Sequence, residues 1–226
     1  MQNKYCLPIQ KTSKQDILDT IHTHANEYAF FEVWLDYVES FDLAFLNQLV
    51  EQLHGKLVIV FRHKNLEPIV MPLDKRLAVL DRLSDTPVLV DLDQASQATE
   101  LKYVQDNNLQ LNTVVSHHDY TKTPTNAELE SLVNSMLSWK PTVLKIAAMC
   151  QTEMDAVRLL GLQLNLKARG QRHIILGMGE HGVITRVFGT LWGNELIFVP
   201  DAQNEASAPG QLTRQQLNDI TKALKG

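Results

Sequence analysis

The sequence predicts an α/β protein built as a closed (β/α)8 barrel, and two observations support this prediction. Short apolar runs alternate with amphipathic, helix-like stretches along the whole chain, which is typical of parallel βα units. Polar residues at positions 32, 62, 91, 118 and 145 fall in or at the end of successive apolar runs, at intervals of 30, 29, 27 and 27 residues. Because eight such units use all 226 residues, we expect a single domain, residues 1–226, with its active site at the carboxyl ends of the strands.

An open, doubly wound sheet is the alternative architecture. Eight strands would be many for an open sheet of this length, and no glycine-rich phosphate motif follows the first apolar run. The absence of that motif weakens the nucleotide-binding version of the fold. The barrel is therefore favoured.

The first four units are read from their apolar runs and from the helix patterns behind them. The first helix carries Ile17, Ile21 and Ala25 on one face, and Gly55 follows the second helix where a C-terminal glycine is expected. The expected strands are 5–9, 29–35, 56–61 and 87–92, and the expected helices lie near 13–25, 43–53, 73–80 and up to 106.

The last four units follow the same pattern. Thr125 and Glu128 have the spacing of a capping box, and so do Thr213 and Gln216 before the last helix. The expected strands are 111–115, 142–147, 172–176 and 195–199, and the expected helices include 125–136, a stretch reaching 166, and 213–224.

Composition excludes several classes of protein. Hydrophobic residues make up 44% and charged residues 21% of the chain, with a net charge of −5, so no basic surface for nucleic acid or anionic membrane is expected. There is no apolar signal core at the N-terminus and no apolar run of membrane-spanning length. Cys6 and Cys150 have no metal-ligand spacing. We expect a cytoplasmic protein with no metal site and no nucleic-acid or membrane partner.

The segment TVLKIAAM, residues 142–149, places Lys145 in the middle of an apolar strand. Burial pushes an amine toward its neutral, nucleophilic form, so one interpretation is a lysine that forms a Schiff base. The other is a strand-end lysine whose stem is buried and whose charged head reaches water. This segment alone does not decide between them.

Other polar side chains fall at the same rim of the predicted barrel. Taken singly, each has a structural explanation: carboxylates can pair with arginines, a histidine can cap a turn, and glycines can simply turn the chain. Together they favour a functional site, since many costly polar groups converge at one rim. These residues are Glu32, Trp34, Asp36, Arg62, Asp91, Asp93, Ser116, His117, His118, Asp119, Lys145, Arg186, Ser207 and Gln211.

A lysine, a histidine and arginines at one rim suggest imine chemistry on a carboxylated ketone or aldehyde. The imine withdraws electrons from the adjacent carbon, so a histidine can remove a proton there near neutral pH. An arginine can hold the carboxylate through two hydrogen bonds. The residues thus indicate a reaction class but not a substrate.

Seven segments make the chain resemble the type I 3-dehydroquinate dehydratases, the Schiff-base lyases of the shikimate pathway, over essentially its full length. The segments are FEVWLDYVES, VIVFRHK, PVLVDLD, VVSHHDYTKTP, VLKIAAM, GMGEHGVITRVFG and EASAPGQL. The resemblance implies a (β/α)8 barrel that dehydrates 3-dehydroquinate to 3-dehydroshikimate without metal or cofactor. Family members are often dimers, which makes a homodimer one expectation.

The resemblance also implies roles for individual residues. Lys145 would form the imine, and His118 would act as general base and acid. The implied substrate-binding residues are Arg186 at the carboxylate, Ser207 and Gln211 from a closing loop, and Glu32 and Arg62 at the ring hydroxyls.

Two positions depart from the family pattern. The family usually has arginine where this chain has Trp34, and a glutamate that orients the catalytic histidine where this chain has Leu66. Glu67, one place further, is the expected substitute for the orienting carboxylate.

These departures leave two other functions open. One is Schiff-base lyase or aldolase chemistry on a related carboxylated ketone, because Trp34 and Leu66 change the pocket and spare the lysine. The other is a non-catalytic barrel that binds a small acid.

Overall fold

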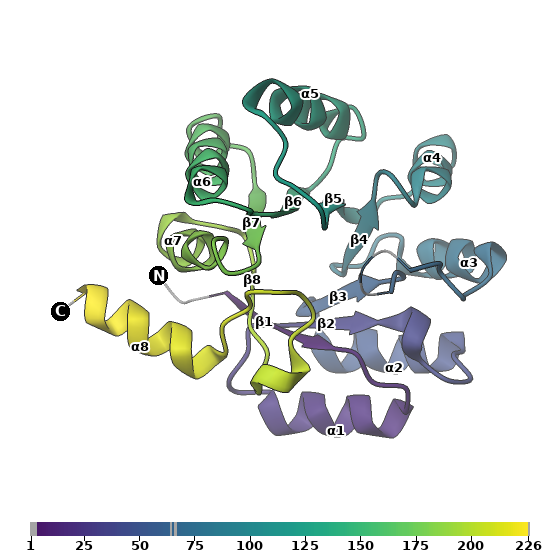
Figure 1. Cartoon of the computed structure of the whole chain (residues 1–226). Helices are drawn as coiled ribbons and strands as arrows, with labels where there is room; N and C mark the ends of the chain where they lie inside the picture. The colour runs from purple at the N-terminus through teal and green to yellow at the C-terminus, as the bar shows by residue number, and fades with distance from the viewer. Residues whose placement is uncertain (1–3, 64, 66, 226) are drawn as a thin grey trace.

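The computed structural model is a parallel eight-stranded sheet that curves into a barrel, with the helices on its outside (Figure 1). It describes residues 4–63, 65 and 67–225. The strands are β1 Tyr5–Ile9, β2 Phe30–Trp34, β3 Leu57–Val60, β4 Leu89–Asp93, β5 Asn112–Asp119, β6 Val143–Met149, β7 His173–Met178 and β8 Ile197–Phe198. The helices are α1 Lys14–His24, α2 Leu43–Leu53, α3 Leu73–Leu83, α4 Ala98–Asp106, α5 Asn126–Leu137, α6 Glu153–Ala168, α7 Val183–Trp192 and α8 Arg214–Lys225.

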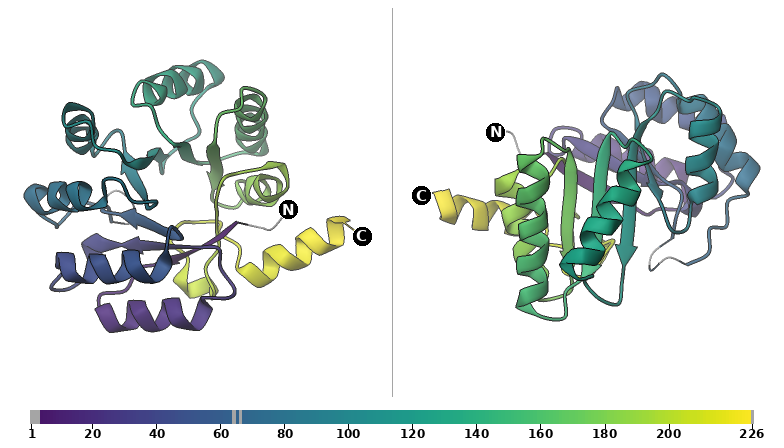
Figure 2. Two further views of the ribbon diagram at one scale, coloured as in Figure 1. Left: turned by 180° about the vertical axis from the view of Figure 1, so that it is seen from behind. Right: turned by 90° about the horizontal axis from the view of Figure 1, so that it is seen from above.

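The strand order is that of a (β/α)8 barrel. The strands pair in the order β7-β6-β5-β4-β3-β2-β1-β8, so each strand from β1 to β7 lies beside its neighbours in the sequence and β8 returns to pair with β1. The two views in Figure 2 show the helices outside the strands from behind and from above. The prediction of a TIM barrel is confirmed.

A side chain helps to close the seam between β7 and β8. The Asn194 amide accepts a hydrogen bond from the Ile175 backbone N–H and donates one to the Ile175 carbonyl, both at 3.0 Å, which replaces the missing strand contact. Gly189 makes room for it, since a Cβ there would lie 2.4 Å from Asn194 Nδ2. One backbone bond, from Glu195 N–H to the His173 carbonyl, completes the seam.

The predicted helix starts have the expected caps. Thr125 and Glu128 form a capping box at α5, with both reciprocal hydrogen bonds present. Thr213 and Gln216 make the equivalent pair of bonds before α8. Local sequence therefore fixes where these helices begin.

Alternation along the strands separates two apolar layers. In β6, Leu144, Ile146 and Ala148 pack outward against the helices, whereas Val143 and Ala147 face the barrel interior. Lys145 lies between Val143 and Ala147 in this alternation and therefore points into the barrel. The interpretation in which the charged head of Lys145 reaches water is excluded, because the residue is only 4% exposed.

β5 and β8 differ most in length from the prediction. β5 runs on through His118 to Asp119, because Ser116, His118 and Asp119 keep pairing with Lys145, Ala147 and Ala148 of β6. β8 is reduced to Ile197–Phe198, because its ladder is with β1 alone. The longer β5 is what carries the histidine into the barrel mouth.

Candidate active site

Lys145 is held inside the barrel by charged groups. Its Nζ donates to Asp91 Oδ2 at 2.7 Å and lies 3.7 Å from Glu32 Oε1. The face of the Phe198 ring is 4.3 Å away, in a cation–π contact. The strand that carries Lys145 is apolar, but neighbouring strands place carboxylates beside the amine.

Asp91, on β4, is the centre of this charged network. It accepts two hydrogen bonds from Arg62, at 2.7 and 3.0 Å, and one from Ser116 Oγ at 2.5 Å, in addition to that from Lys145. Burial acts to raise the pKa of the Asp91 carboxyl, but Arg62 and Lys145 outweigh it and hold that pKa well below its usual range. Asp91 is therefore a permanent anion that fixes two cations. Its place at a strand end is visible in the sequence, but its role is not.

His118 faces the same cavity from β5. Its Nδ1 lies 2.9 Å from Asp93 Oδ2, so the carboxylate fixes the tautomer with Nδ1–H as donor and Nε2 as the free acceptor. Burial, followed by the charge of Arg62, lowers the pKa of His118 to about 4. The imidazole is therefore neutral at pH 7 and able to accept a proton. His117, one residue earlier on the strand, points to the opposite side.

The orienting carboxylate is Asp93 and not Glu67, which corrects the prediction. β4 and β5 are adjacent, with Asp93 in register with Ser116, so Asp93 reaches His118 two residues further along β5. The Glu67 side chain is exposed, and it lines a shallow depression with Arg76 and Ser96. Leu66, the other departure from the pattern, lies outside the described residues.

Arg186, in the first turns of α7, is a buried cation without a carboxylate partner in the described part of the chain. It is 3% exposed, its Nη2 donates to the Pro209 carbonyl at 3.3 Å, and its Nε has no partner among the described atoms. Burial lowers the pKa of its guanidinium to about 10. Desolvating a charge in this way is costly, so the position is prepared for an anion.

The segment between β8 and α8 covers the cavity. The Ser207 backbone N–H donates to Gln211 Oε1 at 2.7 Å, and Gln211 Nε2 donates to Ser207 Oγ at 2.9 Å. Gly210, at φ +77°, approaches Gly179 so closely that a Cβ would lie 2.5 Å from the Gly179 carbonyl oxygen. This close approach keeps the two side chains over the barrel mouth.

All seven predicted catalytic and substrate-binding residues line one cavity of about 30 Å³. Trp34 also lines it, and its Nε1–H donates to Glu32 Oε2 at 2.7 Å. The full lining is Glu32, Trp34, Arg62, His118, Tyr120, Lys145, Ala147, Leu176, Met178, Arg186, Phe198, Ser207, Ala208 and Gln211.

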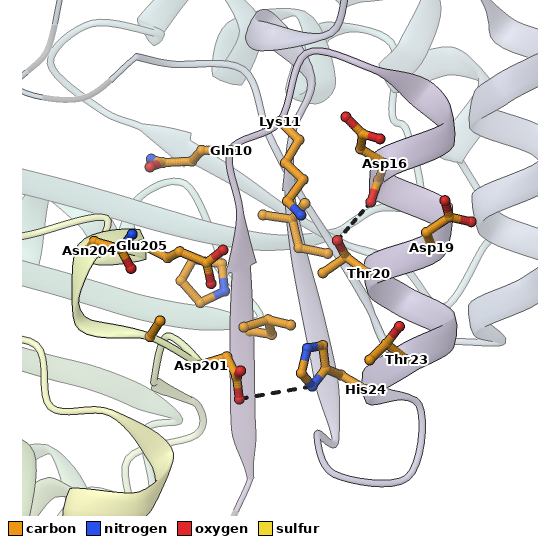
Figure 3. A pocket seen from close by; sticks show the side chains of 14 residues that line it. Gln10, Lys11, Asp16, Asp19, Thr20, Thr23, His24, Asp201, Asn204 and Glu205 are labelled. Atoms are coloured by element: carbon orange, nitrogen blue, oxygen red, sulfur yellow. Dashed lines mark hydrogen bonds and ion pairs between the residues drawn. The ribbon is translucent and has the colours of Figure 1, made fainter.

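A larger groove of about 530 Å³, named here the outer groove, is lined by residues of β1, of α1 and of the segment between β8 and α8 (Figure 3). Two of its lining residues, His24 and Asp201, form with Glu27 the one group of possible metal ligands in the described part of the chain, with one ligand atom of each residue within 4.8 Å of the others. Glu27 is already paired with His24 at 2.8 Å and with Arg214 at 3.0 Å.

None of the described helices is long and apolar enough to span a bilayer.

A parallel barrel with a lysine, a neutral histidine and an unpaired arginine in one buried cavity defines a barrel enzyme that acts on a small anion. The family model of type I 3-dehydroquinase matches residues 5–226. The chain belongs to this family. It is therefore a hydro-lyase that dehydrates 3-dehydroquinate, and the family works without a cofactor.

Individual relatives agree with this assignment. The 3-dehydroquinate dehydratase of Clostridium botulinum is 29% identical over 240 residues, covering 98% of this chain and 92% of the relative. The enzyme of Methanosarcina acetivorans is 32% identical over 151 residues, covering 66% and 62%.

Solved structures share the fold. A Clostridium difficile type I 3-dehydroquinate dehydratase with covalently modified comenic acid has a TM-score of 0.81 at 24% identity, covering 98% of this chain and 92% of that one. The Geobacillus kaustophilus 3-dehydroquinate dehydratase has a TM-score of 0.84 at 20% identity, covering 100% and 92%.

Proposed function

We propose that the chain converts 3-dehydroquinate to 3-dehydroshikimate through a Schiff base on Lys145. The supporting observation is that Lys145, a neutral His118 and the unpaired Arg186 line one buried cavity. After the amine has lost a proton it attacks the ketone carbon, the carbonyl oxygen leaves as water after protonation, and a protonated imine forms.

His118 carries out the elimination. Its free Nε2 removes a proton from the carbon next to the imine carbon, and the electron pair moves into an enamine. The enamine then expels the hydroxyl, which takes the proton from His118 and leaves as water. Hydrolysis of the remaining imine releases the product and restores Lys145.

Arg186 binds the substrate carboxylate, which supplies the anion that its buried guanidinium lacks. Ser207 and Gln211 contact the same end of the substrate, and Glu32 and Arg62 bind the ring hydroxyls. A cavity of about 30 Å³ holds little more than a water molecule. The 207–211 segment therefore has to move aside before a ring can enter.

The chain acts as one domain, residues 1–226, because the barrel uses every βα unit. It works as a homodimer in the cytoplasm, and its cavity holds no cofactor and no metal during turnover.

The test separates imine formation from elimination. His118→Ala should still give an adduct that borohydride reduces in the presence of 3-dehydroquinate, with product formation reduced at least about a hundredfold. Mass spectrometry of the intact protein measures the adduct and absorbance of the conjugated product measures turnover. Near-normal turnover of His118→Ala would contradict the role of His118, and an unmodified wild-type protein would contradict the Schiff base.

A further inference from the structure

The amine of Lys145 has to lose a proton before it can attack a ketone. In the structure it is paired with Asp91, which is an unsuitable acceptor because Arg62 and Ser116 occupy it as well. Those contacts stabilise the ionised carboxylate and hold the pKa of Asp91 well below its usual range. The imidazole of His118 is held by Asp93 and makes no hydrogen bond to the Lys145 amine among the described atoms. The proton needs another destination.

Glu32 offers one. Its Oε1 lies 3.7 Å from Lys145 Nζ and accepts no hydrogen bond from any described atom, although the side chain is 2% exposed. A buried carboxylate oxygen without a donor gains more from protonation than one that is saturated. Burial, the largest influence, raises the pKa of Glu32 above its ordinary value.

Trp34 determines how Glu32 is presented. Its indole N–H donates to the other oxygen, Oε2, at 2.7 Å, and thereby leaves Oε1 facing the amine. The indole is 4% exposed and is held between Tyr37, at 6.1 Å between ring centroids, and Arg62, at 5.7 Å. An indole gives this hydrogen bond without a positive charge, whereas an arginine would keep the carboxylate ionised.

We propose that Glu32 is the proton acceptor for Lys145 during imine formation, and that Trp34 is a positioning residue that holds it in this role. The inference rests on the Schiff base proposed above. A proton passes from the Lys145 ammonium to Glu32 Oε1, the nitrogen lone pair forms the C–N bond, and the carbonyl electrons move to oxygen. That oxygen takes up a proton from the nitrogen, which gives a neutral carbinolamine. The same proton on Glu32 then returns to the carbinolamine hydroxyl, which leaves as water as the C=N bond forms.

In the described part of the chain, five ionisable groups face Glu32, each from a different strand or from the residues that follow it. The ionisable groups that face it are Cys6 from β1, Arg62 after β3, Asp91 from β4, Tyr120 after β5 and Lys145 from β6. Arg62 and Lys145 favour the carboxylate, and Asp91 opposes it. Replacement of Trp34 alters the hydrogen bond on Oε2 and leaves these five groups in place.

The experiment measures the rate at which borohydride traps the adduct in a single turnover, across pH, in full-length variants. Glu32→Gln should slow trapping about a hundredfold and abolish its decline at low pH, because the amide cannot accept the proton. Trp34→Phe should slow trapping about tenfold and move that decline about one pH unit upward, since a donor to the carboxylate is lost. Trp34→Arg should move the decline downward.

A control variant makes the result specific. Trp192→Phe removes an indole from α7, where it packs on Phe188 outside the cavity, and should trap like the wild type. The inference would be overturned if Glu32→Gln trapped the adduct at the wild-type rate, or if the decline at low pH stayed at the same pH in both Trp34 variants. Either result would leave the Schiff base intact. A wild-type protein without any adduct would instead overturn the proposed function.

Discussion

The barrel mouth and the outer groove are lined by different residues of the segment between β8 and α8, and they differ in size and in chemistry. The groove has about 530 Å³ of free space and the mouth about 30 Å³. The groove's carboxylates are exposed, as with Asp201, whose side chain is 42% exposed and lies 4.0 Å from His24 Nδ1 (Figure 3). The mouth buries Lys145, Arg62 and Arg186 almost completely.

The difference shows that desolvated charge marks the site better than free volume does. An exposed ion pair changes the free energy of unfolding little in either direction, so it requires no functional explanation. A buried guanidinium without a carboxylate, such as Arg186, lowers stability unless a ligand supplies the missing charge. The comparison therefore predicts large effects on activity at the mouth and small ones at the groove.

The largest expected effect is that of Lys145→Ala, which removes the nucleophile. Turnover of 3-dehydroquinate should fall at least about a thousandfold, with the fold kept, because Asp91 remains paired with Arg62. Steady-state kinetics and thermal unfolding measure the two effects. Residual turnover within tenfold of the wild type would remove the lysine from the mechanism.

The pH dependence of folding comes next, and it depends on His118. Its pKa is about 6.5 in the unfolded chain and about 4 in the folded one, so between these values the unfolded state binds more protons. The stability that neutral His118 contributes is present above pH 6.5 and is lost as pH falls toward 4. Over this pH window His118 changes the free energy of unfolding by roughly 3 kcal/mol. Denaturant unfolding of wild type and His118→Gln at several pH values should show a shallower slope in the variant over this window, and parallel slopes would contradict the assignment.

Arg186→Met should separate function from stability. KM for 3-dehydroquinate should rise about a hundredfold, because the carboxylate loses a bidentate partner. The midpoint of thermal unfolding should rise, because a buried unpaired cation is removed. An unchanged KM would show that the carboxylate binds elsewhere.

Asp93→Asn should have a smaller effect, on kcat. The histidine loses its orienting carboxylate, and kcat should fall about tenfold to a hundredfold. Glu67→Gln is the matched control, since Glu67 is exposed and should leave kcat within about twofold of the wild type. The reverse ranking of the two variants would restore Glu67 as the orienting residue.

The smallest effect is expected in the outer groove. Asp201→Asn and His24→Gln should each leave kcat within about twofold and change stability by less than about 0.5 kcal/mol. Kinetics with and without added Zn²⁺ or Mn²⁺ tests both variants. A tenfold loss, or metal activation that the variants abolish, would make the groove a functional site.

The fold and much of the site composition were accessible from sequence, because apolar runs and strand-end residues recur once per βα unit. That regularity placed His118 and Lys145 at adjacent positions of the rim, where β5 and β6 pair. The Asp93–His118 contact was not accessible, since it depends on the register between β4 and β5. The bond from Trp34 to Glu32 depends likewise on the rotamer of a side chain that sequence spacing does not define.

The most direct test of the account asks which lysine carries the substrate. The protein is treated with 3-dehydroquinate and borohydride, digested, and its peptides are sequenced by mass spectrometry. We expect a reduced adduct on Lys145, in the peptide that contains TVLKIAAM, with Lys11 of the outer groove unmodified. An adduct on Lys11, or turnover without any adduct on Lys145, would contradict it.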